Sequence, residues 1–529
     1  MTHWTMVADL ERCVGCQTCT AACRHANATS PAVQWRKVLD IEAGTFPNVS
    51  RTFVPVGCQH CADPPCMHVC PTTATRQRVD GIVTIDYELC IGCAYCEVAC
   101  PYQARFLVDA PHFAYGAALQ SEIEREDPGR LGVAQKCTFC SDRIDFGLAN
   151  GLTPGVEPLA TPACVNSCIA DALYFGDIDD PDSNVSRLLR DQKHFRMHEE
   201  LGTEPSFFYL YTRADDNDSR AGSRPSEPKE EKPPTIRTRG VEPWHQPHWN
   251  WKAAANFLCG GAGCGLLAVA AVIAVAGEPF TRPALIGLGL VATGLFLLLF
   301  KIGRPLRSIY VLRQPQRSWM SREAWIAGAL FPLGILAIWF ENRALLFAGS
   351  TCGVLFLYCQ AMILQAAKGV PAWRTPQIVP LMVATGLAEG VGLFLALSPL
   401  RIAVTSIPIA TVLFLLVASR GLAWMSYWKA LRHAGAPARS IAVLDSYRPW
   451  FLAFGLILPL ASIALGIVIE PAAPLAFACG GLSAFAAGWA LKFILVTRAG
   501  YNQGFALNHT PTRGSGIAGA MVKPGWVLP

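Results

Sequence analysis

Apolar residues in the second half of the chain gather into long uninterrupted runs. Eight runs of about 20 residues follow one another, at 253–276, 284–302, 323–341, 344–367, 377–397, 402–422, 450–469 and 474–497. A helix of roughly 20 residues is needed to cross a hydrocarbon core of about 30 Å. Tryptophans such as Trp251, Trp339 and Trp450 stand near the ends of the runs, as in an aromatic belt. The pattern predicts an all-α bundle of eight transmembrane helices.

The region before these runs differs in character and predicts a soluble domain. Residues 213–250 are charged and rich in Pro and Ser, which is typical of an extended linker. The sequence therefore predicts a soluble domain at 1–212, a linker at 213–250, a membrane domain at 251–500 and a cytoplasmic tail at 501–529.

Charge separates the two halves as sharply as hydropathy does. The chain of 529 residues has a formal net charge of +5. Residues 1–250 hold 23 Lys and Arg against 33 Asp and Glu, whereas residues 251–529 hold 21 against 6. This split excludes a single globular domain. It also disfavours nucleic acid as a partner, because the basic charge lies in the membrane-like half.

Lys and Arg in the second half are concentrated in alternate loops. The loops after the even-numbered runs, together with the tail, hold 16, whereas the loops on the other side hold only Arg282, Arg343 and Arg401. Positive charge marks cytoplasmic loops. The opening MTHWTMVADL also carries no basic, apolar or twin-arginine export signal. We therefore expect a multi-pass protein of the bacterial inner membrane, with both termini and the first domain in the cytoplasm.

Sixteen of the 21 cysteines lie before residue 170 in four groups. The groups are Cys13, Cys16, Cys19 and Cys23; Cys58, Cys61, Cys66 and Cys70; Cys90, Cys93, Cys96 and Cys100; and Cys137, Cys140, Cys164 and Cys168. The first and third share the ferredoxin spacing C-x2-C-x2-C-x3-C, and Pro71 and Pro101 follow two of the groups. Four thiolates per cluster give four [4Fe–4S] clusters in an α+β ferredoxin-like repeat domain. Structural zinc and a disulfide scaffold are the alternatives, which this dense and regular spacing disfavours.

Residues 1–210 resemble the four-cluster electron-transfer subunit of the dimethyl sulfoxide reductase-like molybdoenzymes. The resemblance is carried by CVGCQTCTAAC, CQHCADPPCMHVCP, CIGCAYCEVACP and KCTFCSDR…PACVNSC. The ligand sets that it implies are Cys13, Cys16, Cys19 with Cys168; Cys23 with Cys137, Cys140, Cys164; Cys58, Cys61, Cys66 with Cys100; and Cys70 with Cys90, Cys93, Cys96. In relatives the first set faces a catalytic subunit and the last faces the membrane.

Other charged residues and cysteines call for simpler interpretations. Lys136, Arg143 and Arg105 stand beside the cysteine groups, and we expect them to be solvated surface charges. The alternative is that such cations raise the reduction potential of a neighbouring cluster. The five cysteines of the second half are expected to be small apolar residues rather than ligands: Cys259, Cys264, Cys352, Cys359 and Cys479.

The membrane half offers no obvious haem site. Its histidines, His433 and His509, lie in a loop and in the tail, so no b-type haem is expected. A mobile quinone, ubiquinone or menaquinone, is then the expected redox partner in the lipid bilayer.

Two places are candidates for quinone or proton chemistry. One is the loop after the second run, with Lys301, Arg304 and Arg307, although positive-inside charge explains these residues equally well. The other is Glu389, a carboxylate deep inside the fifth run, where a charge is costly and usually functional. The GxxxG pair around Glu389 allows the alternative that it only bridges a helix contact.

The membrane half resembles the dimethyl sulfoxide reductase-type anchor family through GRPLR…SWMSRE and YNQGFAL…PTRG. Within that family it is most similar to the anchors of membrane-bound sulfite dehydrogenase and phenylacetyl-CoA:acceptor oxidoreductase. The resemblances imply a fused electron-transfer and anchor subunit that links a large cytoplasmic molybdopterin catalytic subunit, most similar to sulfite dehydrogenase, to membrane quinone. The chain itself would hold no molybdopterin.

Two other functions remain open at this point. A redox-driven proton-translocating quinone oxidoreductase would need a series of carboxylates inside the membrane. A reductase served by a soluble donor would need no molybdenum partner.

Overall fold

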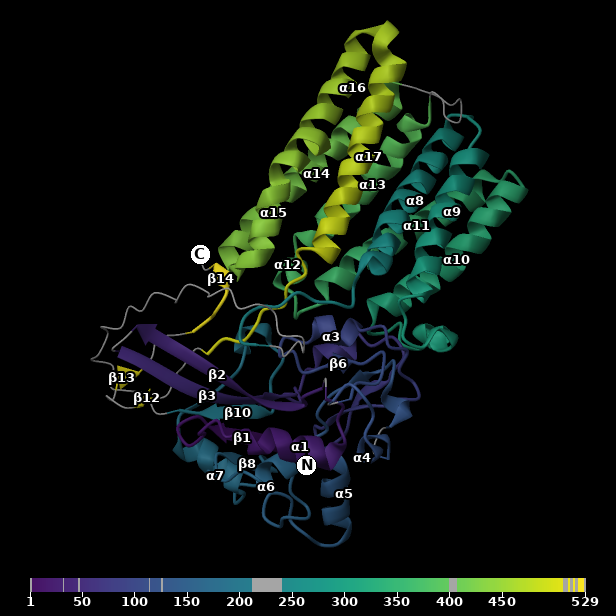
Figure 1. The fold of residues 1–529 in the computed structure, drawn as a ribbon. Coiled ribbons are helices and arrows are strands. Elements are labelled where there is room, and N and C mark those ends of the chain that lie inside the picture. Colours follow the sequence, from purple (N-terminus) through teal and green to yellow (C-terminus); the bar gives the residue numbers. More distant parts are fainter. Residues whose placement is uncertain are drawn as a thin grey trace. The chain divides into compact units, whose positions relative to one another are not determined.

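A computed structural model describes residues 2–31, 33–45, 48–113, 115–124, 127–211, 240–398, 407–507, 512–513, 517–518 and 522–527. The chain divides into two compact units (Figure 1). The first combines Met1–Trp244 with Asn502–Trp526, and the second combines His245–Tyr501 with Val527–Pro529. Most of the predicted linker, as well as Arg401 and His509, lies outside the described residues.

A four-stranded sheet in the order β8-β1-β10-β9 underlies the first unit. β1 (Trp4–Asp9) runs parallel to β10 (Phe207–Leu210) and antiparallel to β8 (Leu173–Asp177), and β9 (His194–Arg196) closes one edge. All four residues of β10, FFYL, are buried. A strand covered on both faces reads as a continuous apolar run, which explains the composition of β1 and β10.

Short helices and hairpins surround this sheet. The helices are α1 (Thr18–Asn27), α2 (Pro65–His68), α3 (Tyr95–Ala99), α4 (Gln120–Ile123), α5 (Ser141–Ala149), α6 (Ala163–Asn166) and α7 (Asn184–Asp191). The paired strands are β2 (Arg36–Thr45) with β3 (Asn48–Gly57), β4 (Thr75–Gln77) with β5 (Val83–Ile85), β6 (Phe106–Leu107) with β7 (Ala134–Gln135), and β12 (Thr512–Arg513) with β13 (Ile517–Ala518). The core of the unit includes cysteines of the four groups beside aromatic residues such as Trp35, Phe139 and Phe207.

Segments on both sides of the second unit's sequence belong to the first unit. Phe505 and Leu507, in the predicted tail, are buried in the first unit's core. The Phe505 N–H donates to the Val241 carbonyl at 2.9 Å. The described residues between 502 and 526 are therefore part of the first folded unit.

The second unit is a bundle of long helices. They are α8 (Trp251–Val275), α9 (Thr281–Leu299), α10 (Trp319–Trp339), α11 (Arg343–Gln365), α13 (Ile378–Ala396), α14 (Ile407–Ala434), α15 (Ala438–Trp450), α16 (Leu458–Val468) and α17 (Ala473–Thr497). α15 and α16 are joined by a π-helical segment, Phe451–Ile457, so they form one span. The described residues thus contain eight helical segments long and apolar enough to cross a membrane, as the eight runs predict.

Small residues bring α8 into the centre of the bundle, where it packs against α9, α11, α13 and α17. A Cβ atom on Gly390 of α13 would overlap the backbone of Gly265 in α8. This close approach is the role that small residues play between membrane helices. It places Glu389, the neighbour of Gly390, at a junction of several helices.

Candidate functional site

The structure brings the sixteen cysteines together in four sites. Site A contains Cys13, Cys16, Cys19 and Cys168, which line one small hollow. Site C contains Cys58, Cys61, Cys66 and Cys100, which line another. Site B contains Cys23, Cys137, Cys140 and Cys164, and site D contains Cys70, Cys90, Cys93 and Cys96, as the charge interactions among their thiols indicate. These are the sets that the resemblance implies.

The backbone repeats the same turn in each group. The second residue after the first cysteine is left-handed in all four, namely Gly15 (φ 73°), His60 (φ 42°), Gly92 (φ 70°) and Phe139 (φ 54°). Left-handed residues in such loops turn successive backbone N–H groups inward, which forms an anion-binding concavity. The repeat visible in the sequence is therefore also a repeat of backbone geometry, suited to an anionic metal–sulfur core.

Backbone amides are directed at the thiols themselves. The N–H groups of Phe139 and Ala172 donate to the sulfurs of Cys137 and Cys168 at 3.4 and 3.3 Å. Among the described residues, no three Cys, His, Asp or Glu side chains are close enough to share a single metal ion. The thiols stand around hollows, an arrangement that fits a multi-atom cluster.

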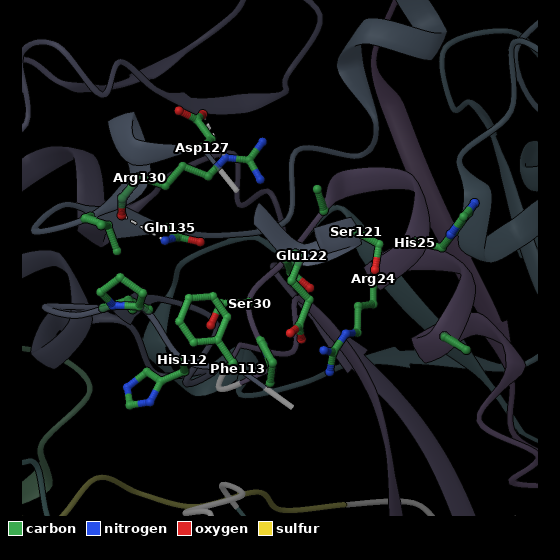
Figure 2. A pocket seen from close by; sticks show the side chains of 17 residues that line it. Arg24, His25, Ser30, His112, Phe113, Ser121, Glu122, Asp127, Arg130 and Gln135 are labelled. Atoms are coloured by element: carbon green, nitrogen blue, oxygen red, sulfur yellow. Dashed lines mark hydrogen bonds and ion pairs between the residues drawn. The ribbon is translucent and has the colours of Figure 1, made fainter. Parts of the chain in front are cut away.

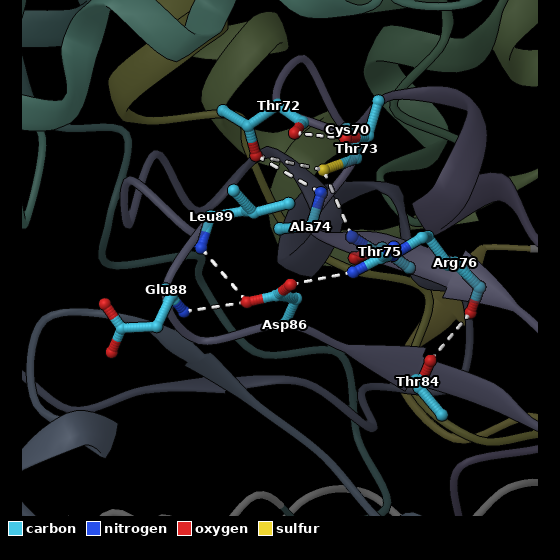
Figure 3. Close-up of polar contacts among 10 residues, drawn as sticks. All are labelled: Cys70, Thr72, Thr73, Ala74, Thr75, Arg76, Thr84, Asp86, Glu88 and Leu89. Atoms are coloured by element: carbon cyan, nitrogen blue, oxygen red, sulfur yellow. Dashed lines mark hydrogen bonds and ion pairs between the residues drawn. The ribbon is translucent and has the colours of Figure 1, made fainter.

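Site D is tied together by contacts across the β4–β5 hairpin (Figure 3). The Thr75 N–H donates to the Cys70 sulfur at 3.5 Å. Arg76 donates to Asp86 at 2.7 Å, and Asp86 accepts from the N–H groups of Glu88 and Leu89, just before Cys90. The two loops that carry cysteines of site D are therefore held in a fixed relation.

The four sites form a series, A–B–C–D. Cys19 of site A interacts electrostatically with Cys164 of site B, and Cys137 of site B interacts with Cys58 of site C. The Arg105 guanidinium faces both site C and site D.

The exposure of the cysteines follows the order of the four sites, with the more exposed cysteines at the two ends. In sites B and C all eight cysteines are buried, whereas Cys16 of site A is exposed and Cys93 of site D is partly exposed. Burial raises the pKa of the Cys19 thiol to about 11, and the Arg36 guanidinium opposes that shift.

Two cations predicted to be surface charges are interior residues. Arg105 and Lys136 are each 1% exposed, so that expectation was wrong for both. Arg105 donates to the Cys66 sulfur at 2.9 Å, and the Lys136 ammonium donates to the carbonyls of Val83 and Cys137. Both fill interior positions between cysteine loops and hairpins.

Arg143 is only partly buried and donates to the carbonyls of Thr161 and Pro158. A further interior cation, Arg36, has no signal in the sequence, because it begins an otherwise ordinary strand. It is 1% exposed and donates to Met6 Sδ at 2.8 Å.

Glu389 in the membrane unit has a partner that the sequence reasoning missed. Lys492 of α17 donates to Glu389 Oε2 at 2.6 Å and to the Phe257 carbonyl at 3.2 Å. Both side chains of the pair are fully buried. Lys492 is a single cation within the eighth apolar run, which is the signal that would have identified it.

A second buried polar group joins α8 to α10 and α11 through Asn256, Glu323 and Gln360. The Asn256 side chain donates to Glu323 at 3.1 Å, and Gln360 donates to the Asn256 carbonyl at 2.8 Å. Glu323 is 3% exposed, although the sequence places it at a span end. The membrane unit therefore buries two carboxylates, each bonded to a side chain of another helix.

Arg420 corrects the count of loop charges. α14 continues to Ala434, beyond the predicted end at 422, and Arg420 is fully buried inside it. Its guanidinium donates to the carbonyls of Ala484 and Gly455. Pro459, four residues after Gly455, has no N–H to offer that carbonyl, and Arg420 donates to it instead of a residue-459 amide. The loop charges on the more positive side fall from 16 to 15, so that side still carries most of the Lys and Arg.

The cationic loop after α9 is less deeply buried than the Glu389–Lys492 pair. It contains a 3₁₀ segment, Pro305–Arg313, and Lys301, Arg304 and Arg307 are all partly buried. The Lys301 ammonium lies 5.5 Å from the centre of the Trp249 ring, a cation–π contact.

A pocket of about 360 Å³ lies apart from the cysteine sites in the first unit (Figure 2). It is lined by charged and polar side chains that include Arg24, His25, Glu122 and Arg130. None of the sixteen grouped cysteines lines it.

Comparisons with known proteins match both units. A family model described as a 4Fe-4S dicluster domain matches residues 49–115, and one described as the DMSO reductase anchor subunit (DmsC) matches residues 270–425. The selenate reductase B subunit of Mesobacillus selenatarsenatis is 40% identical over 224 residues, which cover 39% of this chain and 72% of the relative. The sulfite dehydrogenase B subunit of Allochromatium vinosum is 37% identical over 229 residues, 40% of this chain and 85% of the relative. The arsenate respiratory reductase iron–sulfur subunit of Shewanella sp. is 35% identical over 233 residues, 39% of this chain and 94% of the relative.

The fold and the cysteine sites define an iron–sulfur electron-transfer protein joined to a membrane anchor. The fold class predicted from the sequence, a ferredoxin-like α+β domain followed by a helical membrane bundle, is confirmed. The chain belongs to the family of iron–sulfur subunits of the dimethyl sulfoxide reductase-type molybdoenzymes, fused to an anchor of the same systems. It is an electron-transfer and anchor subunit that works with a catalytic partner.

Proposed function

We propose that this chain carries electrons through four [4Fe–4S] clusters, held by sites A to D, between a cytoplasmic molybdopterin subunit and membrane quinone. The observation that carries this proposal is the series A–B–C–D with buried cysteines in the middle and accessible ones at the ends. A conductor between two partners needs an entry and an exit near the surface, and its interior steps need shielding from water. Bound clusters would supply one-electron transfer, while the cysteines fix their order.

Site A is the end that we assign to the catalytic partner. Val14 and Ile169, beside Cys16 and Cys168, are 57% and 72% exposed. Neighbouring exposed apolar side chains at the rim of an exposed redox site support a protein contact there. The resemblance implies the same direction, with site D toward the membrane.

A variant pair tests the docking end. Ile169→Asp places a charge at the rim of site A, and we expect it to release the catalytic subunit during purification of the complex. Val79→Asp is the matched control, because Val79 is 97% exposed and lies on the β4–β5 turn, which carries none of the site A cysteines. Equal retention of the partner by both variants would contradict the assignment of this end.

The quinone end is proposed for the membrane unit. Support comes from the Glu389–Lys492 pair, because ionisable residues buried inside a span usually serve ion or proton chemistry. Lys301, Arg304 and Arg307 at the end of α9 remain the second proposed place. Loop charges favour cytoplasmic termini and an inner-membrane location, which reporter fusions at each terminus would test.

Sulfite is the substrate that we propose for the catalytic partner, with electrons passing to quinone. Support comes from the likeness to the iron–sulfur subunit of a sulfite dehydrogenase and from the likeness of the membrane half to sulfite dehydrogenase anchors. Phenylacetyl-CoA oxidation is the alternative. Since an electron-transfer subunit holds no substrate pocket for the partner's reaction, its sequence identifies the substrate only by likeness.

Purification of the complex from native membranes tests the proposal as a whole. We expect molybdenum, a large co-purifying subunit, iron for four clusters, and quinone reduction on addition of sulfite. Iron without molybdenum or a large subunit would refute the partnership. Quinone reduction by phenylacetyl-CoA but not by sulfite would show that phenylacetyl-CoA is the substrate of the catalytic partner.

A further inference from the structure

Two arginines of the first unit are almost completely buried, although a charged guanidinium is normally exposed to water. Arg36 and Arg105 are each 1% exposed. A guanidinium remains charged at any pH that a protein tolerates. Burying such a charge is strongly unfavourable unless an opposite charge lies beside it. Each arginine therefore needs a source of negative charge in the interior.

Each arginine lies at a junction between two cysteine sites. The strongest charge interactions of Arg36 are with Cys164, Cys137 and Cys23 of site B and with Cys19 of site A. Those of Arg105 are with Cys66, Cys58 and Cys100 of site C and with Cys96 of site D. Lys136 occupies the middle junction, facing Cys58 and Cys66 of site C and Cys137 of site B. The two guanidiniums are the stronger case, because their charge does not depend on pH.

The hydrogen bonds fit an anionic group that the cysteines hold. Arg105 already donates to the Cys66 sulfur. Arg36 Nε and Nη1 are buried and have no acceptor among the described residues. Buried donors without partners are rare in folded proteins, so these two are free to serve sulfur atoms of a neighbouring cluster.

We infer that Arg36 and Arg105 are counter-charges built into the electron-transfer series, each raising the reduction potentials of the two clusters between which it lies. Reduction adds one electron to a cluster that its four thiolates already make negative, and a fixed cation beside it favours that step. Net charge and hydrogen bonds to sulfur are among the main determinants of cluster potential. This inference rests on the four clusters of the proposed function and assigns their tuning to two side chains.

Redox titration of the purified complex, followed by electron paramagnetic resonance, tests the inference. Arg36→Gln should lower the equilibrium constant for one-electron reduction of two clusters tenfold or more. A tenfold change corresponds to a fall of about 59 mV in reduction potential. Arg105→Gln should lower the equilibrium of the other two by a similar factor. Arg190→Gln is the control, because Arg190 is 61% exposed on α7 and should move none. The conservative variants Arg36→Lys and Arg105→Lys keep the charge, so their clusters should retain reduction potentials close to those of the wild type.

The pattern of shifts separates tuning from a structural role. Iron content measured on every variant shows whether all clusters are assembled. Unchanged potentials in fully loaded variants, or the same two clusters moving in both, would overturn the inference. If Arg36→Gln loses its clusters, Arg105→Gln decides the question at the other junction. Fewer than four clusters in the wild-type complex would instead refute the cluster count of the proposed function.

Discussion

Removal of the Lys492 ammonium is the sharpest test of the membrane site. In Lys492→Met the Glu389 carboxylate loses its ion-pair partner while it stays fully buried. Breaking a buried ion pair by removing one partner typically costs about 3–5 kcal/mol, since it leaves an uncompensated charge. At about 2–4 °C per kcal/mol for a unit of this size, the melting temperature should fall by about 6–20 °C.

The double variant tells pairing from simple loss of packing. Glu389→Gln with Lys492→Met removes both charges, and replacing a buried pair by uncharged residues of similar size is often close to neutral. We expect it to melt higher than Lys492→Met alone, measured by intrinsic fluorescence of the purified protein in detergent. Glu389→Gln alone should slow quinone turnover while the spectra of the clusters stay intact. If the losses in melting temperature add in the double variant, the ion pair does not explain the stability. If Glu389→Gln has normal quinone turnover, Glu389 has no part in the function.

Two further outcomes follow from particular residues. Cys93→Ser should change site D alone, lowering iron by about one to four atoms per chain according to whether a three-iron core survives, whereas Cys479→Ser in α17 should leave the iron content unchanged. Gly261→Ala should destabilise the membrane unit and disturb Glu389, because its Cβ would overlap Lys492 Nζ. Gly289→Ala is its matched control: nothing lies within 4 Å of the added Cβ, and we expect an unchanged melting temperature.

Features that depend on neighbours along the chain were predictable. The eight spans follow from the length of apolar runs, because a helix satisfies its own backbone hydrogen bonds within one segment. The cysteine spacing also acts locally, since one loop wraps one side of a cluster. The spacing does not identify the distant cysteine that completes each set. The assignment of Cys168 to site A, for example, came from the resemblance.

The interior charges depended on the tertiary structure. Arg36, Arg105 and Lys136 read as ordinary cations in the sequence, and their burial results from hairpins and loops that close over the cysteine sites. Lys492 and Glu389 are 103 residues apart and meet because glycines such as Gly392 and Gly481 let α13 and α17 pack closely. The sequence by itself determined the fold class, the apolar spans and the four cysteine groups, since local spacing specifies each of them. Only the packing of distant segments decided which charges are removed from water and which groups compensate them.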